Sequence, residues 1–310
     1  MTFINYILRK ISENLSFFFK NKLNINLIEE KQIYKVIRKK LKKIEINKKL
    51  LKLTHIQFNQ QIKSIIINND LKNLLRYSFV QKMFFVHNRW FIFKELQELK
   101  KSKKWNTYKR LIAEDNTGNP VRYFLYSESS GNRIHQVYHL SIIEKYLKIS
   151  FKNFKKIFEL GGGYGCLARI FTKYYKFKSY KIFDTEIVNL IQYYYLKIQN
   201  CDVGFTAKNK IYLLNKFENK NKKYDIFIAN WSLSEIPIDY RIKFIPIIRN
   251  SKFILISFQE KFEEINNLEF FIYLKNKLHK KFKIKIIKNN FYKGSFFKKQ
   301  NHYYFIGKKL

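Results

Sequence analysis

The stretch KKIFELGGGYGCLARIF, residues 155–171, decides the fold class of this chain. Four of the chain's nine glycines lie between Gly161 and Gly165, directly after a short apolar run. A glycine inside a helix or strand costs about 0.5–1 kcal/mol relative to alanine, so this cluster indicates a sharp turn or a close approach of the backbone to another group. The apolar residues after the glycines recur every three or four positions, which predicts a helix. The stretch therefore predicts a buried strand, a glycine-rich turn and a helix.

From residue 155 onward, short apolar runs alternate with longer helical patterns. Strands are predicted at 155–160, 180–184, 224–231, 252–258, 282–288 and 302–309, with a weakly marked one near 203–207 or 210–214. Helices are predicted at 164–175, 185–200, 238–249 and 263–278. Alternation of strand and helix predicts an α/β fold with a parallel, doubly wound sheet. The last two strands have no helix between them, which predicts an antiparallel pair.

Upstream of this core, residues 1–110 are predicted to form a basic helical region. An apolar face at helical spacing marks its first helix: Phe3, Ile4, Ile7, Leu8, Ile11, Leu15, Phe18 and Phe19. This helix could contact a membrane surface, whereas the simpler role of the region is a cap on the core. Residues 111–150 carry no net charge and contain the turn-rich clusters EDNTGNP and SESSGN, which predicts a lid or a connecting segment. Residues 151–310 are the predicted ligand-binding domain.

Composition limits the classes of protein to consider. The 310 residues carry a formal net charge of +39, spread along most of the chain and mostly from lysine. Such a bias, with abundant Asn, Ile, Phe and Tyr, is typical of an AT-rich genome; a polyanion-binding surface is the alternative. No long uncharged apolar run predicts a membrane span, and charges interrupt the N-terminal apolar residues. Cys166 and Cys201 are the two cysteines, so no disulfide framework is predicted and the expected compartment is the cytoplasm.

The spacing of the glycines distinguishes between ligands. In a doubly wound sheet, ligands bind outside the carboxyl ends of the strands, where the strand order reverses. A dinucleotide motif, G-x-G-x-x-G, would place its third glycine on Cys166, and no Gly-Lys-Ser/Thr of a P-loop is present. What remains is Glu159 followed by G-x-G-x-G at Gly161, Gly163 and Gly165, a form typical of class I S-adenosylmethionine-dependent methyltransferases.

This cofactor suits the residues. S-adenosylmethionine carries no phosphate but a bulky sulfonium zwitterion, and Gly161 and Gly163 would let the backbone approach it, with Glu159 near its ammonium end. Asp184 ends the next predicted strand, 23 residues after Gly161, close to the separation of about 20 expected for a carboxylate that binds a ribose. Glu186 is the alternative, and an aspartate at this place is also a common helix N-cap.

A third segment, YDIFIANWSLSEIP at 224–237, ends a strand at Asn230 beside the same crevice. The following loop contains Trp231, Ser232, Ser234 and Glu235. Enzymes that methylate adenine bases characteristically have Asn/Asp-Pro-Pro-aromatic here, to hold a flipped base, and this chain lacks the prolines. Neither cysteine is placed to attack a cytosine. Nucleic-acid bases are therefore disfavoured as substrates.

The chain resembles a family of bacterial sugar O-methyltransferases in three features: ELGGGYG at 159–165, the aspartate after the next strand, and NWSLSEI at 230–236. The segment 134–147 resembles the helix that this family carries before its first strand, and the resemblance covers roughly residues 120–310. One departure is that Asp184 is followed by Thr185 and Glu186 instead of Leu-Pro-Glu. The resemblance implies a Rossmann-like class I methyltransferase fold with a seven-stranded, mostly parallel sheet. It also implies S-adenosylmethionine as cofactor, held in part by Asn230, and a glycan or nucleotide-sugar as substrate.

Methyl transfer to a sugar hydroxyl needs a group that positions the hydroxyl and removes its proton, ideally with a pKa near neutrality. Glu235 is the first candidate for this base, and His139, which shares a helical face with His135, is the second. Each has a structural alternative: Glu235 could order its loop, and His139 could be a packed core residue. No cluster of Asp and His suggests a metal site.

Two other functions stay open from the sequence. One is an RNA methyltransferase that uses the basic N-terminal region as an electrostatic platform. The other is a non-catalytic binding module that retains the methyltransferase fold.

Overall fold

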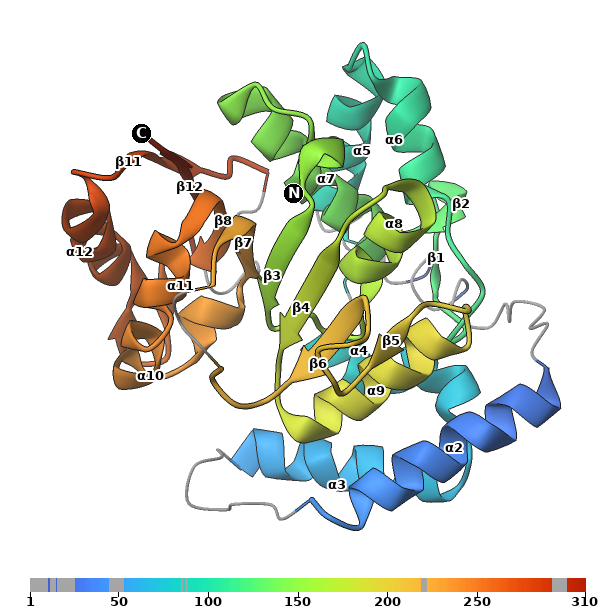
Figure 1. The fold of residues 1–310 in the computed structure, drawn as a ribbon. Helices are drawn as coiled ribbons and strands as arrows, with labels where there is room; N and C mark the ends of the chain where they lie inside the picture. Colours follow the sequence, from blue (N-terminus) through green and yellow to red (C-terminus); the bar gives the residue numbers. More distant parts are fainter. Residues whose placement is uncertain are drawn as a thin grey trace. The chain divides into compact units, whose positions relative to one another are not determined.

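The computed structural model describes residues 11, 15, 26–44, 53–84, 86, 89–218, 222–291 and 300–310 (Figure 1). Most of the helix predicted from Phe3 to Phe19, and with it the predicted membrane contact, lies outside these residues. The chain divides into two compact units. The first contains Met1–Tyr138, Gly163–Ile170 and Thr185–Gly204, and the second contains His139–Gly162, Phe171–Asp184 and Phe205–Leu310.

A mostly parallel sheet forms the centre of the second unit (Figure 1). Seven of its strands belong to this unit, in the spatial order β11-β12-β8-β7-β3-β4-β6. Their bounds are β3 Lys156–Leu160, β4 Ser179–Phe183, β6 Ile211–Leu214, β7 Tyr224–Asn230, β8 Ser251–Gln259, β11 Phe282–Lys288 and β12 His302–Lys309. Strands β6, β4, β3, β7 and β8 pair in parallel, whereas β12 runs antiparallel to both β8 and β11. The predicted fold class is confirmed, including the antiparallel final pair.

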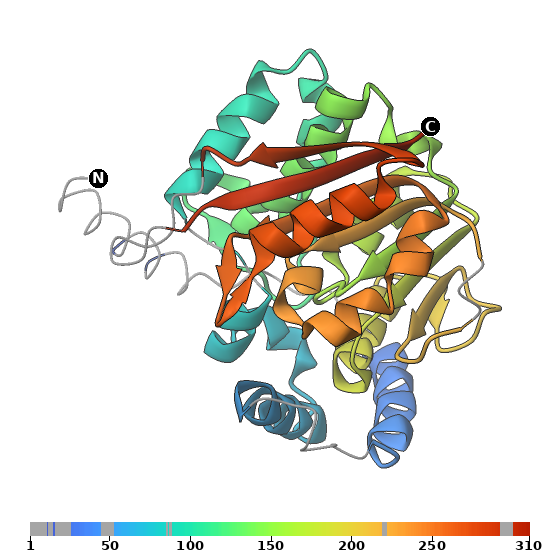
Figure 2. The same cartoon turned by 90° about the vertical axis from the view of Figure 1, so that its left-hand side faces the viewer.

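Helices α10 (Ile238–Ile242), α11 (Ile245–Arg249) and α12 (Asn267–Leu278) belong to the same unit, and Figure 2 shows α12 running alongside the strands. Apolar side chains of these helices and of the strands form one core. It includes Phe158, Phe183, Phe227, Ile254, Phe258, Ile248, Phe271 and Leu274. Alternate residues of each strand point to this face, so Phe158 enters the core while its neighbour Glu159 lies on the opposite face.

Two predicted helices differ from the structure. The single helix predicted over 238–249 is two short helices, because Pro246 has no amide hydrogen and its ring crowds the carbonyl one turn earlier. The helix predicted over 263–278 begins only at Asn267. The preceding residues instead form a small hairpin of β9 (Lys261–Phe262) and β10 (Ile265–Asn266), and the Asn266 side chain caps α12.

The first unit is mainly helical, as predicted for the N-terminal region. Its elements are α2 Leu27–Leu41, α3 Leu53–Ile67, η1 Leu71–Arg76, α4 Ser78–Met83, α5 Trp90–Lys101, α6 Trp105–Ile112, β1 Arg122–Tyr123, β2 Tyr126–Ser130, α9 Glu186–Lys197 and β5 Val203–Gly204. Helices α7 (Gly131–Leu147) and α8 (Cys166–Tyr174) contribute residues to both units, and a short turn, η2 (Phe151–Asn153), belongs to the second. In the described part of the chain, no helix combines the length and the apolar character that crossing a membrane requires.

Helix α2 packs on α9 within the first unit. The rings of Tyr34 and Tyr194 lie 5.6 Å apart, and the Tyr194 hydroxyl donates a hydrogen bond of 2.6 Å to Glu30 Oε1. Residues of the N-terminal region therefore form one core with a helix that follows the glycine-rich turn in the sequence.

Candidate functional site

The carboxyl edge of the sheet has the reversal of strand order at which doubly wound folds bind ligands. The chain leaves β3 toward β4 and β6 on one side, and it returns to β7 and β8 on the other. Gly161, Asp184 and Asn230 stand at the ends of β3, β4 and β7, so the second unit brings together three of the predicted cofactor residues.

Gly161 has two structural reasons to be glycine. Its φ of +70° lies in the left-handed region, and a Cβ at this position would lie 2.2 Å from the Cβ of Ser232. Ser232 is held there by a hydrogen bond from its hydroxyl to the Leu160 carbonyl, and the Gly161 amide donates to the Phe183 carbonyl at 2.9 Å. The loop after β7 thus packs directly on the glycine turn, a contact that the sequence pattern did not reveal.

The other two predicted glycines, Gly163 and Gly165, belong to the first unit. Their φ values are +55° and +97°. A Cβ on Gly165 would lie 3.2 Å from Leu196, whereas one on Gly163 would make only ordinary contact with Phe84. Gly163 is therefore required mainly by its backbone conformation.

Two helices of the first unit fix this turn through polar side chains. Gln192 of α9 donates from Nε2 to the Gly163 carbonyl at 3.0 Å, and Asn132 of α7 donates from Nδ2 to the Tyr164 hydroxyl at 2.9 Å. Sequence reasoning missed Asn132 and Gln192, because single polar residues within helical patterns carry no motif.

Glu159 lies inside the sheet, with only 4% of its surface exposed. Its Oε2 accepts a hydrogen bond of 2.8 Å from the Tyr180 hydroxyl. Burial, opposed by the Tyr180 hydrogen bond and assisted by the nearby Asp184 carboxylate, raises the pKa of this carboxyl to about 7. Its predicted position beside the cofactor's ammonium group stays a prediction.

Asp184 directly follows β4 and is half-buried. Its backbone amide donates to the Leu214 carbonyl at 3.0 Å, which fixes its position at the end of the strand. Glu186, the alternative carboxylate, is exposed.

Asn230 ends β7, where its Oδ1 accepts a long hydrogen bond of 3.4 Å from the Ser257 hydroxyl. The next residue, Trp231, has a φ of +65°. A bulky residue in the left-handed region is strained, and such strain is concentrated at functional sites. The Trp231 amide donates to the Ser257 carbonyl at 2.8 Å, which helps to hold this conformation.

This backbone turn brings the Trp231 ring to two histidines. Its centroid lies 6.3 Å from that of His139 and 5.8 Å from that of His302, edge to face in both cases. His139 is 1% exposed, and its Nδ1 shares a hydrogen bond of 2.9 Å with the Tyr304 hydroxyl. The second predicted catalytic residue is thus a buried neighbour of the loop that carries the first.

Glu235 ends the short turn η3 (Ser232–Glu235) and is exposed as a whole. Its Oε1 accepts from Gln259 Nε2 at 3.4 Å, and Gln259 Oε1 accepts from the Ser234 hydroxyl at 2.9 Å. Desolvation by the protein atoms around the carboxyl raises its pKa to about 7, and the hydrogen bond from Gln259 opposes this rise. Solvent at the exposed side of Glu235 reduces the desolvation.

A buried arginine that sequence reasoning missed fixes the same loop. Arg241 is fully buried and donates at 2.7 Å to the carbonyls of Ser234 and Ile236 and to Asn267 Oδ1. These bonds hold the backbone on both sides of Glu235.

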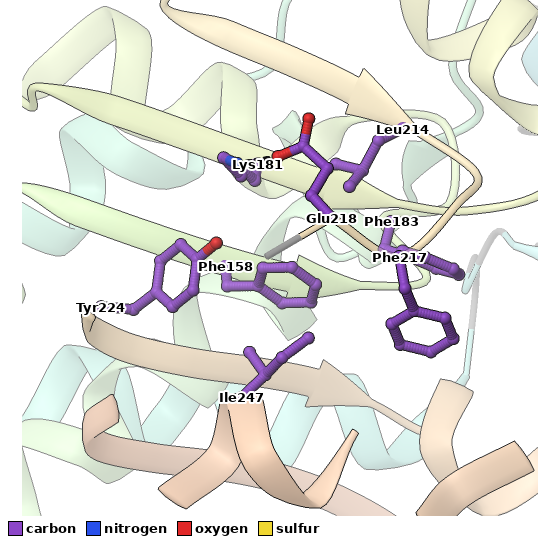
Figure 3. A pocket seen from close by; sticks show the side chains of 8 residues that line it. All are labelled: Phe158, Lys181, Phe183, Leu214, Phe217, Glu218, Tyr224 and Ile247. Atoms are coloured by element: carbon purple, nitrogen blue, oxygen red, sulfur yellow. Dashed lines mark hydrogen bonds and ion pairs between the residues drawn. The ribbon is translucent and has the colours of Figure 1, made fainter. Parts of the chain in front are cut away.

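A small cavity lies on the face of the sheet to which the core residue Phe158 points (Figure 3). It is lined by Phe158, Lys181, Phe183, Leu214, Phe217, Glu218, Tyr224 and Ile247. Its volume of about 10 Å³ has room for a single water molecule at most, so it is not a substrate site. Among the described residues, no group of three or more His, Cys, Asp or Glu side chains could hold a metal ion.

The chain matches no protein-family model and no curated protein. Among solved structures it is similar to the N-terminal domain of EvdMO1 with SAH bound, at 11% identity and a TM-score of 0.43 over 67% of this chain and 98% of that chain. It is also similar to the methyltransferase domain of bacterial CtHen1 (12% identity, TM-score 0.39, 55% and 96% covered). A third is the ribosomal protein L11 methylase from Lactobacillus delbrueckii subsp. bulgaricus (16% identity, TM-score 0.36, 57% and 80% covered). Similarity at such TM-scores does not identify a substrate. The Rossmann-like α/β fold is defined by the strand order of this chain itself.

Proposed function

We propose that this protein transfers the methyl group of S-adenosylmethionine to a hydroxyl group of a sugar, in a glycan or a nucleotide-sugar. One observation carries the proposal: Gly161, Asp184 and Asn230 end three neighbouring strands at the reversal of strand order. The loop after the third of these strands carries Trp231 and Glu235, and its Ser232 packs on Gly161.

The residues at this edge fit the cofactor. Asp184 offers a half-buried carboxylate that can accept hydrogen bonds from ribose hydroxyls, and Gly161 presents backbone without a side chain. When bound, S-adenosylmethionine would supply an electrophilic methyl group on its sulfonium sulfur.

The loop after β7 supplies what a hydroxyl acceptor needs. A carboxylate with a pKa raised toward neutrality is a suitable general base, and Glu235 meets this condition. Trp231 is half-buried, and aromatic rings can pack on a sugar. The resemblance of NWSLSEI to sugar O-methyltransferases favours a sugar over RNA, since the motif that grips a flipped base is absent.

Calorimetric titration with S-adenosylmethionine tests the cofactor site. Asp184→Ala should weaken binding by about 1.5–3 kcal/mol, which is the range for hydrogen bonds to a charged group. The matched control is Glu186→Ala, which removes an exposed carboxylate two residues later and should leave the affinity unchanged. If Glu186→Ala weakens binding and Asp184→Ala does not, the ribose contact is assigned to the wrong carboxylate; no measurable binding by the native chain would refute the proposal.

Turnover tests the base. Glu235→Gln should lower kcat by roughly 10²–10⁴-fold, because the amide cannot accept the proton, while cofactor affinity stays the same. A base acts when it is deprotonated, so the native rate should fall as the pH falls below about 7 through the raised pKa of Glu235, and the variant should lose this limb. Glu264→Gln, which changes an exposed glutamate elsewhere in the same unit, serves as control. Unchanged turnover in Glu235→Gln together with a lower melting temperature would make Glu235 a loop-ordering residue, and His139→Gln would be the next variant.

A further inference from the structure

A basic groove runs along helix α2 in the first unit. We call it the α2 groove, and it is lined by Leu27, Glu30, Lys31, Tyr34, Lys35, Arg38, Lys39, Lys42, Asn69 and Lys72. Its volume of about 720 Å³ is large enough for several residues of a polymer.

The groove concentrates unpaired positive charge. It contains five lysines, all exposed, and none of them pairs with an acidic side chain in the part of the chain that the structure describes. Exposed lysines elsewhere do form such pairs, as Lys252 does with Asp225 at 2.9 Å. The one acidic residue of the lining, Glu30, is 8% exposed and accepts a hydrogen bond from the Tyr194 hydroxyl, so a single carboxylate stands against five lysines and Arg38.

The cations form a row rather than a single cluster. Lys31, Lys35 and Lys39 are four residues apart on one helical face, which separates them by about 6 Å each along the axis. Arg38 is fixed beside them, because its Nη2 donates to the Ile67 carbonyl at 3.1 Å and to Asn69 Oδ1 at 2.8 Å. A row of this kind matches a chain of regularly spaced phosphates better than one phosphate group.

Among the residues that the structure describes, the lining of the groove offers no exposed aromatic ring on which a nucleobase could stack. Proteins that bind single-stranded nucleic acids combine a basic groove with exposed aromatic rings. Tyr34 is the aromatic residue of the lining, but it is 5% exposed and its hydroxyl accepts the Leu71 amide at 2.8 Å. The groove can therefore contact phosphates but not bases.

A bilayer also fits this surface poorly. Helix α2 buries Ile33 and Ile37 in the protein, which leaves Leu27, Ile28 and Val36 exposed as separate apolar residues and not as a continuous face for lipid. A flat surface would also not fill a groove that extends inward to Glu30 and Tyr34.

We propose that the α2 groove binds an extended polymer whose units are joined by phosphodiesters and carry no bases, as in a phosphate-bearing glycan. The identification of this polymer as the acceptor rests on the proposed sugar methylation. The binding itself depends only on the groove.

Fluorescence anisotropy with a labelled poly(glycerol phosphate) oligomer tests the proposal, using the full chain without cofactor and a series of salt concentrations. The test variant is Lys35→Gln/Lys39→Gln, and the matched control is Lys283→Gln/Lys285→Gln, two exposed lysines of β11 with the same loss of charge. Each phosphate contact contributes about 0.7 to the slope of log K against log salt for a single strand. The test variant should therefore lower the slope by about 1.4 and the affinity by roughly tenfold or more, while the control stays close to the native chain.

Other probes decide between ligands. Neutral dextran should not bind, and an RNA oligonucleotide with the same number of phosphates should bind no more tightly than the glycerol phosphate polymer. Tenfold tighter binding to RNA, capture by anionic vesicles without polymer binding, or equal losses in both lysine variants would overturn the proposal. Polymer binding that follows these predictions, together with no methyl transfer to a phosphate-bearing glycan, would contradict the identification of the polymer as the acceptor and leave the groove assignment intact.

Discussion

At the scale of the residue, Gly161 shows how closely the loop after β7 packs on the glycine turn. Gly161→Ala would add a left-handed alanine, which costs about 1–2 kcal/mol, and a Cβ that meets Ser232 at 2.2 Å. We expect a loss of unfolding free energy above 2 kcal/mol in urea titrations. In the Gly161→Ala/Ser232→Gly variant the collision is relieved and the backbone cost remains, so stability should return in part. Equal stabilities of the single and double variants would show that the contact with Ser232 is not tight.

Glu159 predicts a pH dependence of stability. Its carboxyl has a folded-state pKa of about 7, above the unfolded value of 4.5. Its contribution to the free energy of unfolding is therefore fully present below pH 4.5 and is lost as the pH rises through 7. Glu159→Gln removes this titration. The unfolding free energy of the variant, relative to that of the native chain, should therefore be about 3 kcal/mol higher at pH 9 than at pH 5. Urea titrations at the two pH values measure the gain, with Glu264→Gln as the exposed control. Parallel curves for the native and variant chains would contradict the raised pKa.

At the scale of the element, a buried ion network joins the segment after α6 to helices α7 and α8 in the first unit. Arg133 of α7 is fully buried and donates from Nε to the Leu111 carbonyl at 3.0 Å. Its Nη1 lies 3.8 Å from Glu114 and 3.4 Å from Asp115, which also pairs with Arg169 of α8 at 3.2 Å. The neutral stretch 111–150, predicted as a lid or connection, thus contains charges that are internally paired; its role as a lid stays a prediction.

This network should be sensitive to the loss of one partner. Arg133→Met leaves a buried carboxylate uncompensated and should cost about 3–5 kcal/mol of unfolding free energy. Arg133→Met/Glu114→Gln should recover part of this loss, because the buried carboxylate of Glu114 is then replaced by a neutral amide and Asp115 keeps its pair with Arg169. Lys109→Met changes an exposed residue of α6 as the control and should stay within about 0.5 kcal/mol of the native chain. No recovery in the double variant would show that Arg133 stabilises the fold through packing alone.

At the scale of the whole molecule, the first unit is assembled from three separate stretches of the chain. A chain that starts at residue 111 would lack α2 and leave Tyr194 of α9 without its partners Tyr34 and Glu30. We expect this shortened chain to lose the cooperative thermal transition of the first unit, measured by circular dichroism. A cooperative melt near that of the full chain would show that the N-terminal region is an independent cap.

A point variant tests the same packing without a deletion. Tyr34→Ala should cost about 3–5 kcal/mol, as for other buried aromatic residues. Val36→Ala changes an exposed residue of the same helix and should have little effect.

Sequence patterns predicted the local features of this protein well. The strand–turn–helix at the glycines and the order of strands and helices depend on periodicities of two and 3.6 residues, which neighbouring residues alone set. The placement of Gly161, Asp184 and Asn230 at strand ends follows from that order, because parallel strands end at the same edge of a sheet. Even the error at 238–249 has a local cause in Pro246.

By itself, then, the sequence determined the fold class, the sheet edge at which the candidate site lies and the residues that end its strands. Only the tertiary structure decided that β12 lies between β8 and β11, that α2 packs on α9, and that Arg133 faces Glu114. It also decided the left-handed turn at Trp231, the position of Ser232 against Gly161, and the row of cations in the α2 groove. These features join residues far apart in the chain, and their energies depend on burial and mutual distance, which no local pattern of residues encodes.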